Sequence, residues 1–334
     1  MEAYLGVDVG SMSTKFALLD EDRRLMTKIY LLTQGKPIEM MQQGLKQIKH
    51  CLDNGVHIAG VGTTGSARYL AGTLLGADLI KNEITSHAIA TLQSYPEVKT
   101  IIEIGGQDSK IIIIRDGVVT DFGMNTVCAA GTGSFLDHQA LRLNMSITEF
   151  SERALSYRSP ASIAGRCTVF AESDMIHKQQ SGHSIEDILF GLCQALARNY
   201  INNVGLGKDI KPPVVFQGGV ALNRAMVRAF EEALETEIIV SQNCEIVGAI
   251  GAAILAQEHI IQTGQSSSFR GFDVSEGKYK TSSFECKSCP NLCEIIQLHS
   301  DGSILARWGG RCDRWDVMRD ELTHSLESSP FTKS

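Results

Sequence analysis

One pattern occurs twice in this sequence and limits the folds that the chain can adopt. In each copy, an apolar run reaches an acidic residue, a glycine turn follows, and a second apolar run leads away. The first copy contains Asp8, in YLGVDVGSMSTKFALLD, and the second contains Glu103, in TIIEIGGQDSKIIIIRD. Apolar runs on both sides of a glycine turn are typical of paired β-strands. We therefore expect two structurally similar halves.

The rest of the sequence alternates between strand and helix patterns. Residues 212–234, PPVVFQGGVALNRAMVRAFEEAL, predict a strand, a turn and an amphipathic helix, and residues 244–260 predict a helix rich in small side chains. Strands that alternate with helices are typical of α/β proteins. Such folds bind ligands in the crevice at the carboxyl ends of their strands.

Composition and charge argue against several classes of protein. The formal net charge is −7 and no basic stripe is present, which argues against a nucleic-acid partner. No run of 18 uncharged apolar residues is present, so we expect no membrane span. The first apolar run contains Asp8 and does not resemble a signal peptide. Nine cysteines without an export signal indicate metal or redox chemistry in a reducing compartment. We expect a cytoplasmic protein.

The turn after Asp8 has the residues of a phosphate site. Gly10 permits a close approach of backbone N–H groups to an anion. Ser11 and Ser13 add hydroxyl donors, and Lys15 adds a positive charge. Asp8, at the end of its strand, is suited to hold a hydrated Mg²⁺, which binds few carboxylates and keeps its waters. The sequence therefore predicts that this turn binds ATP with Mg²⁺.

Two further turns extend the predicted ATP site. In the second, Glu103 or Asp108 is a candidate to orient the attacking water or to share the metal. Three glycine turns in one chain favour a nucleotide site over three unrelated hairpins, although neither GxxxxGK[ST] nor GxGxxG occurs. The other candidate ATP-binding residues of these two turns are Gly105, Gly106, Gln107, Gly218, Gly219 and Asn223.

The length of the chain predicts more than one domain. At 334 residues it exceeds the size at which one hydrophobic core usually stops growing. A Gly/Ser-rich stretch near residue 265 separates most of the chain from a short, cysteine-dense end. We expect nucleotide-binding domain I over residues 1–95 with about 245–262, domain II over 96–244, a linker over 263–277, and a cysteine module over 278–334.

Five motifs, in order, resemble a known family. They are GVDVGSMSTK, IEIGGQDSK, NTVCAAGTGSFLD, CTVFAESD and FQGGVALN, and they cover residues 1 to about 260. The chain resembles the BadF/BadG/BcrA/BcrD-type ATPases, which activate 2-hydroxyacyl-CoA dehydratases, within the acetate/sugar kinase, Hsc70 and actin superfamily. This resemblance implies two actin-like, ribonuclease H-like domains around a nucleotide crevice. Glu103 is a departure, because members of the superfamily often have aspartate there.

Cys128 and Cys167 each stand alone, without a CxxC motif. A [4Fe–4S] cluster needs four thiolates, and a twofold-symmetric dimer presents any two cysteines twice. Residue chemistry alone leaves a second interpretation open, in which both are small buried side chains. The resemblance implies that Cys128 and Cys167 of two subunits hold one [4Fe–4S] cluster per dimer.

The C-terminal end has a second group of cysteines. CKSCPNLC followed by GGRC gives the array C-x2-C-x3-C-x18-C. This density predicts a metal site within one subunit, and the spacing leaves open whether it holds Zn²⁺ or an iron–sulfur cluster. The alternative is four free thiols. The residues are Cys286, Cys289, Cys293 and Cys312.

The resemblance implies an ATPase coupled to electron transfer. It would work as a homodimer that reduces a separate low-potential iron–sulfur protein, such as a 2-hydroxyacyl-CoA dehydratase, a benzoyl-CoA reductase or a double-cubane cluster protein. Its own upstream donor would be a ferredoxin or a flavodoxin. Two alternatives stay open: a small-molecule kinase of the same superfamily, and a non-catalytic sensor that binds nucleotide and metal.

Overall fold

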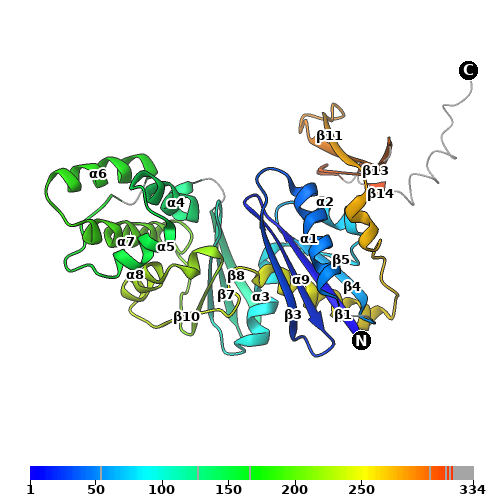
Figure 1. The fold of residues 1–334 in the computed structure, drawn as a ribbon, viewed down its shortest axis with the longest axis horizontal. Coiled ribbons are helices and arrows are strands. Elements are labelled where there is room, and N and C mark those ends of the chain that lie inside the picture. Colours follow the sequence, from blue (N-terminus) through cyan, green and yellow to red (C-terminus); the bar gives the residue numbers. More distant parts are fainter. Residues whose placement is uncertain are drawn as a thin grey trace, which may run out of the picture. The chain divides into compact units, whose positions relative to one another are not determined.

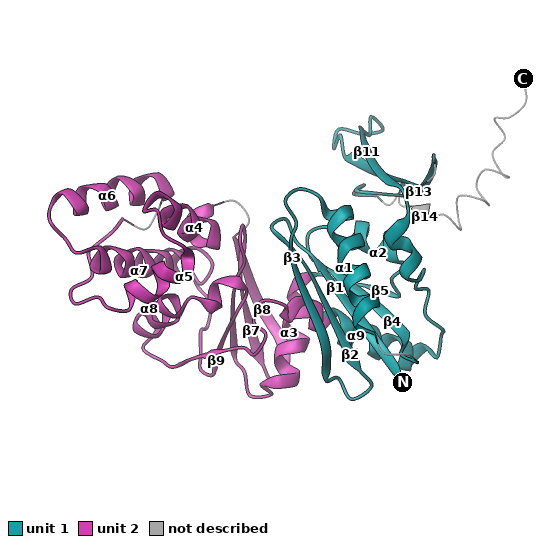
Figure 2. Ribbon diagram, viewed as in Figure 1, with its two compact units in different colours: residues 1–82, 252–334 teal, residues 83–251 magenta. Residues whose placement is uncertain are grey.

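The computed structural model describes residues 1–52, 55–125, 128–164, 167–300, 302–312, 314–315 and 317–318. The chain forms two compact units (Figure 2). Unit 1 contains residues 1–82 and 252–334, and unit 2 contains residues 83–251. In the described ranges, no helix combines the length and the apolar character needed to cross a lipid bilayer.

Unit 1 is built on a five-stranded sheet with the order β3-β2-β1-β4-β5. The first three strands are antiparallel neighbours, whereas β4 and β5 continue the sheet in parallel from β1. Because apolar side chains fill both faces of β1, the strand is buried almost throughout. The strands are β1 (Glu2–Val9), β2 (Ser13–Asp20), β3 (Leu25–Leu32), β4 (His57–Thr64) and β5 (Leu79–Ile80).

Three helices cover this sheet. α1 (Pro37–Cys51) contacts β2 and β3, and α2 (Arg68–Leu75) contacts β1 and β4. α9 (Val247–Thr263) begins in unit 2 and ends in unit 1. Its small side chains let it lie against β4, where a Cβ atom at Gly62 would meet the backbone of Ala252. This close packing agrees with the expected small-residue helix.

Unit 2 repeats the strand arrangement of unit 1. Its sheet has the order β10-β9-β6-β7-β8, with an antiparallel β6-β7-β8 meander and parallel neighbours β9 and β10. This repetition confirms the expected α/β fold with two similar halves. The strands are β6 (Thr100–Ile104), β7 (Ser109–Arg115), β8 (Val118–Asn125), β9 (Val214–Gln217) and β10 (Ile238–Val240).

The helices of unit 2 form a second layer around one long buried helix, α7. It contacts α5, α6 and α8, and its apolar side chains share one core with β6 and β9. Figure 1 shows the main helices of this layer in green. The elements of this layer are η1 (Ala129–Gly131), α4 (Gly133–Arg142), α5 (Ile147–Ala154), α6 (Thr168–Gln180), α7 (Ile185–Asn203), η2 (Gly219–Leu222) and α8 (Arg224–Leu234). In contrast, α3 (Glu83–Ser94), cyan in Figure 1, contacts β7 and packs in a separate hydrophobic cluster.

The C-terminal segment forms a small antiparallel sheet, β11-β12-β13-β14, preceded by the short helix η3. Both belong to unit 1, and their strands are labelled β11, β13 and β14 in Figure 1. The elements are η3 (Phe272–Glu276), β11 (Tyr279–Glu285), β12 (Glu294–Ser300), β13 (Ser303–Trp308) and β14 (Val317–Met318).

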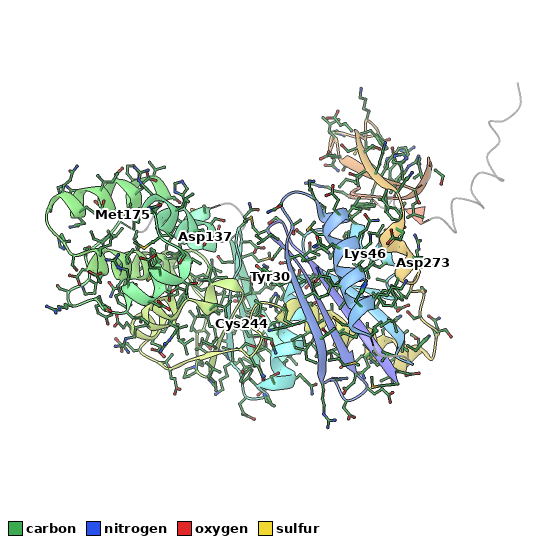
Figure 3. All side chains as sticks on the ribbon, in the orientation of Figure 1. Tyr30, Lys46, Asp137, Met175, Cys244 and Asp273 are labelled. Atoms are coloured by element: carbon green, nitrogen blue, oxygen red, sulfur yellow. The ribbon has the colours of Figure 1, made fainter. Side chains whose placement is uncertain are left out.

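This sheet is continuous with the core of unit 1. Val274, Leu298 and Leu305 are buried in the same hydrophobic cluster as β1 and α1. Gln42 Nε2 on α1 donates to the carbonyls of Val274 and Gly277, at 3.2 and 2.7 Å. Figure 3 labels Lys46 on α1 and Asp273 in η3. The segment expected to be a linker therefore contains a packed helix.

Candidate nucleotide and cluster sites

The first acid-containing turn joins β1 to β2 in unit 1. Gly10 N–H donates to Ser13 O at 2.9 Å and closes the turn. Asp8 is buried at the end of β1 and faces Lys15 across the β1–β2 ladder. Lys15 Nζ lies 2.9 Å from Asp8 Oδ2, and the lysine side chain is 19% exposed. Ser13 is buried, whereas Ser11 is exposed.

Two neighbouring strands support this turn. Thr33, just beyond β3, donates its hydroxyl to Gly10 O at 3.0 Å and its N–H to Met12 O at 2.8 Å. Gly65, just beyond β4, has φ +94°, and a Cβ atom there would lie 2.6 Å from Asp8 Oδ1. Only glycine fits this position without strain. The Asp8 carboxylate is therefore enclosed by backbone on this side.

The second turn joins β6 to β7 in unit 2 and closes in the same way. Gly105 N–H donates to Asp108 O at 3.0 Å. Glu103 is buried at the end of β6, while Asp108 is partly exposed and Gln107 is exposed. A Cβ atom at Gly105 would lie 2.9 Å from Asp108 Oδ1 and 3.5 Å from Glu103 Oε1. Both predicted catalytic carboxylates of this turn therefore lie beside the same glycine.

Sequence reasoning missed a lysine in this second turn. Lys110 faces Glu103 across the β6–β7 ladder, as Lys15 faces Asp8 across β1–β2. In both hairpins the lysine follows the acid by seven residues, a spacing that the sequence contains. Burial acts to lower the pKa of Lys110, but Glu103, Glu83 and Asp108 outweigh it and raise that pKa well above the usual value. These three carboxylates therefore favour the charged form of Lys110.

The third turn follows β9. Gly218 has φ +89°, and a Cβ atom there would lie 2.9 Å from Glu103 Oε1, so this turn lies against the second one. The predicted ligand Asn223 caps α8, since its Oδ1 accepts N–H groups from Ala225 and Met226 at 3.0 and 3.2 Å. Beside Gly219, a Cβ atom would meet nothing within 4 Å among the described residues.

Three buried polar atoms beside these turns make no hydrogen bond with the described residues. Thr64 Oγ1, across the β1–β4 ladder from Asp8, has no hydrogen-bond partner among the residues that the structure describes. The same is true, within that part of the chain, of Ser109 Oγ and Asn223 Nδ2. Buried polar atoms of this kind usually have a partner.

Cys128 precedes η1 and α4 in unit 2, and residues 126–127 before it lie outside the described residues. The side chain of Asn125, the last residue of β8, forms two hydrogen bonds with the backbone of Cys128. Asn125 Nδ2 donates to Cys128 O at 2.8 Å, and Cys128 N–H donates to Asn125 Oδ1 at 3.0 Å. The thiol-bearing residue is half-buried. Its backbone is therefore fixed to the end of the β7–β8 hairpin.

The start of α4 is bound directly to the second turn. Gly133 N–H donates to Gly105 O and Ser134 N–H to Gly106 O, both at 2.9 Å. The Ser134 hydroxyl also donates to Gly106 O. The segment that carries Cys128 and the turn that carries Glu103 are therefore one hydrogen-bonded structure.

Cys167 precedes α6, and residues 165–166 before it lie outside the described residues. Arg142 on α4 forms an ion pair with Glu172 on α6, so the helices that follow the two cysteines are joined. Asp137 on α4 and Met175 on α6 mark these helices in Figure 3. Cys167 and Cys128 are both half-buried at helix starts, which fits thiolate ligands.

Three of the C-terminal cysteines, Cys286, Cys289 and Cys293, lie in the connection between β11 and β12, and Cys312 follows β13. Cys286 N–H donates to Cys293 O at 2.8 Å, and Trp315 Nε1 donates to Cys286 Sγ at 3.2 Å. Hydrogen bonds from Ser288 and Trp315 lower the pKa of the Cys286 thiol. Within the described ranges, no three His, Cys, Asp or Glu side chains are arranged to hold a metal ion. The four-cysteine metal site stays a prediction from the sequence.

The model of the BadF/BadG/BcrA/BcrD ATPase family matches residues 5–256, which include all three turns, Cys128 and Cys167. The protein belongs to this family. The (R)-2-hydroxyglutaryl-CoA dehydratase activating ATPase of Acidaminococcus fermentans is 35% identical over 257 residues, which are 75% of this chain and 96% of that protein. The family assignment therefore rests on nearly the full length of the relative.

Two solved structures show that the fold is that of the family. Component A of the A. fermentans dehydratase has a TM-score of 0.69 at 33% identity, covering 77% of this chain and 98% of that one. The activator of the 2-hydroxyisocaproyl-CoA dehydratase from Clostridium difficile, with bound ADPNP, has a TM-score of 0.69 at 30% identity, covering 78% and 97%. The expected actin-like fold is confirmed. The β11–β14 sheet lies outside the family match.

Proposed function

We propose that this protein hydrolyses Mg·ATP to drive electron transfer from a [4Fe–4S] cluster, held between two copies of the chain, to a separate low-potential iron–sulfur protein. One observation carries the proposal. The second phosphate turn and the start of α4, directly after Cys128, share three hydrogen bonds, from the N–H groups of Gly133 and Ser134 and from the Ser134 hydroxyl. A turn that responds to the γ-phosphate would move the cysteine segment with it.

The nucleotide part of the proposal uses the two acid-containing turns. Asp8 would hold the hydrated Mg²⁺, with Lys15 near the phosphates, and the N–H groups around Gly10 would bind phosphate oxygens. Glu103 and Asp108 would orient the attacking water. The relatives named as an activating ATPase and as an activator with bound ADPNP support this assignment.

The cluster part uses Cys128 and Cys167. When bound, a [4Fe–4S] cluster supplies one-electron chemistry, and two half-buried thiols per chain supply half of its ligands. Val169 and Phe170, directly after Cys167, are 68% and 67% exposed in the single chain. Two exposed apolar side chains beside a ligand fit a surface that a second copy covers. The proposal therefore includes a homodimer, with a ferredoxin or a flavodoxin as the upstream donor.

We also propose that the C-terminal cysteines bind a metal, Zn²⁺ or an iron–sulfur cluster. The Cys286–Cys293 backbone hydrogen bond holds two of the four residues together at the base of one hairpin. Cys286 already accepts a hydrogen bond from an indole N–H, as metal-bound thiolates do. Metal binding would draw Cys289 and Cys312 toward this pair.

The experiment compares three proteins prepared without oxygen: wild type, Cys128→Ser and the control Cys51→Ser, which changes an exposed cysteine at the end of α1. We expect all three to hydrolyse ATP. Wild type and Cys51→Ser should transfer electrons to a low-potential iron–sulfur acceptor only with ATP, and Cys128→Ser should not. A wild-type protein that phosphorylates a sugar or an acid, and transfers no electrons, would support a kinase instead.

A further inference from the structure

Lys110 lies at the centre of an ion cluster that is unlike the rest of unit 2. Its Nζ is 2.6 Å from Glu83 Oε2, 2.8 Å from Asp108 Oδ2 and 3.0 Å from Glu103 Oε2. The lysine side chain is only 2% exposed. Three carboxylates surround one buried ammonium, and of these Glu103 is the most buried, at 7% exposed, while Asp108 is 36% exposed. Removing the ammonium would leave the buried Glu103 carboxylate without its counter-charge, which is costly.

Both the backbone and the ammonium group of Lys110 are held in place by contacts. The Tyr200 hydroxyl on α7 donates to the Lys110 carbonyl at 2.6 Å and fixes its backbone. Glu83, the first residue of unit 2 and of α3, fixes its ammonium. Lys110 therefore has little freedom to reach a ligand.

Lys110 contacts one oxygen of each catalytic carboxylate. It contacts Glu103 Oε2 and Asp108 Oδ2, while the other oxygens, Oε1 and Oδ1, lie beside Gly105 in the turn. The contact between a fixed ammonium and each carboxylate sets the direction of the second oxygen. The remaining titratable group on α3 near this sheet, His87, is directed to Gln217, since the two side chains are 3.0 Å apart.

We propose that Lys110 is a positioning residue for ATP hydrolysis, which orients Glu103 and Asp108 toward the Gly105 turn without touching the nucleotide. This inference rests on the proposed ATPase function. It gives Lys110 a different role from Lys15, which is partly exposed, lies at the end of the first phosphate turn and would contact phosphate itself.

The test measures ATPase kinetics of Lys110→Met and of the control Lys211→Met, which changes an exposed lysine of the same unit. In Lys110→Met, we expect kcat to fall at least about tenfold while KM for ATP changes less than about threefold, because misplaced catalytic groups act on the transition state and not on binding. Lys110→Arg should recover part of kcat. The control should match the wild type.

The double variant Lys110→Met/Glu83→Gln separates positioning from charge balance. Removing one carboxylate should restore part of the melting temperature lost in Lys110→Met, since less uncompensated charge stays buried. Its kcat should stay low. Recovery of a wild-type kcat in the double variant, an unchanged kcat in Lys110→Met, or a large rise in KM would each overturn the inference. A wild-type protein without ATPase activity would overturn the proposed function itself.

Discussion

The β1–β2 hairpin of unit 1 and the β6–β7 hairpin of unit 2 are built alike and charged differently. Each has an acid at the strand end, a glycine turn, and a lysine across the ladder from the acid. Lys15 is partly exposed beside Asp8, whereas Lys110 is buried among three carboxylates. Under the proposed function, the same scaffold would offer a positive charge to phosphate in one unit and oriented carboxylates in the other.

The two hairpins share their backbone and differ in their side chains. The backbone of each turn closes with the same hydrogen bond, from Gly10 to Ser13 and from Gly105 to Asp108. The side chains differ, and we propose that this difference gives each turn its own role in ATP hydrolysis. Serine residues and a reachable lysine suit anion binding, while paired acids suit the positioning of water.

The most severe test of the comparison removes one acid from each hairpin. Asp8→Asn and Asp108→Asn should each lower the ATPase kcat roughly 10²–10³-fold, because each change removes charge that stabilises the transition state. Steady-state ATPase assays with excess Mg²⁺ measure this. Asp22→Asn, which changes an exposed acid of unit 1, is the control. Near wild-type rates in both variants would show that these turns do not form the site of ATP hydrolysis.

A second difference between the units is that unit 1 carries the C-terminal sheet on its core. A chain ending at residue 277 loses Leu298 and Leu305, two buried leucines of the unit 1 cluster. We expect it to be less stable by at least about 3 kcal/mol, at roughly 1.5–3 kcal/mol for each buried side chain. Denaturant unfolding measures this. Equal stability of the two chains would mean that the sheet is an independent appendage.

The two lysines should also differ in kinetics. Lys15→Met should raise KM for ATP about tenfold or more, with a smaller effect on kcat, since a charge-assisted contact to phosphate contributes about 1.5–3 kcal/mol. Lys110→Met should show the reverse. If both variants lower kcat and leave KM unchanged, the two lysines have the same role and the comparison fails.

The smallest expected effect concerns the length of the acid in unit 2. Glu103→Asp withdraws the carboxylate from Lys110 Nζ, which now lies 3.0 Å away. We expect kcat to fall about threefold, because a displaced carboxylate orients water less well. The kcat of Glu103→Asp is compared with the kcat of Asp8→Glu, the opposite change in unit 1. This comparison shows whether each hairpin requires the length of its natural acidic side chain. An unchanged kcat in both variants would show that the length of the acidic side chain does not matter for ATP hydrolysis.

The two hairpins could be predicted from the sequence because their pattern lies within a short stretch of neighbouring residues. Asp8 and Glu103 each follow an apolar run and precede a glycine turn, and the structure places both at strand ends. The lysine spacing was also present, but its meaning depends on Glu83, which comes from the start of a different helix. Side-chain clusters assembled from distant elements have no local pattern in the chain.

Two other features depended on tertiary packing. Asn223 was expected only as a nucleotide contact, and its second role, in which its carboxamide oxygen caps α8, is set by the helix that begins there. The cysteine-dense end was expected only as a metal-binding module after a linker, and the pattern of the chain did not show that Leu298 and Leu305 pack in the unit 1 core. Packing partners of this kind are decided by the whole fold.

The most direct test of the central claim is the iron content of a full-length variant with serine at Cys286, Cys289, Cys293 and Cys312. Substitution is preferable to deletion, because the sheet that carries these cysteines packs on unit 1. After anaerobic reconstitution, elemental analysis and the dimer mass give iron per dimer. The account predicts about four irons per dimer, lost when Cys128 or Cys167 is also changed to serine, since a [4Fe–4S] cluster needs four thiolates. Near zero iron in the quadruple variant, or about four irons per monomer, would contradict it.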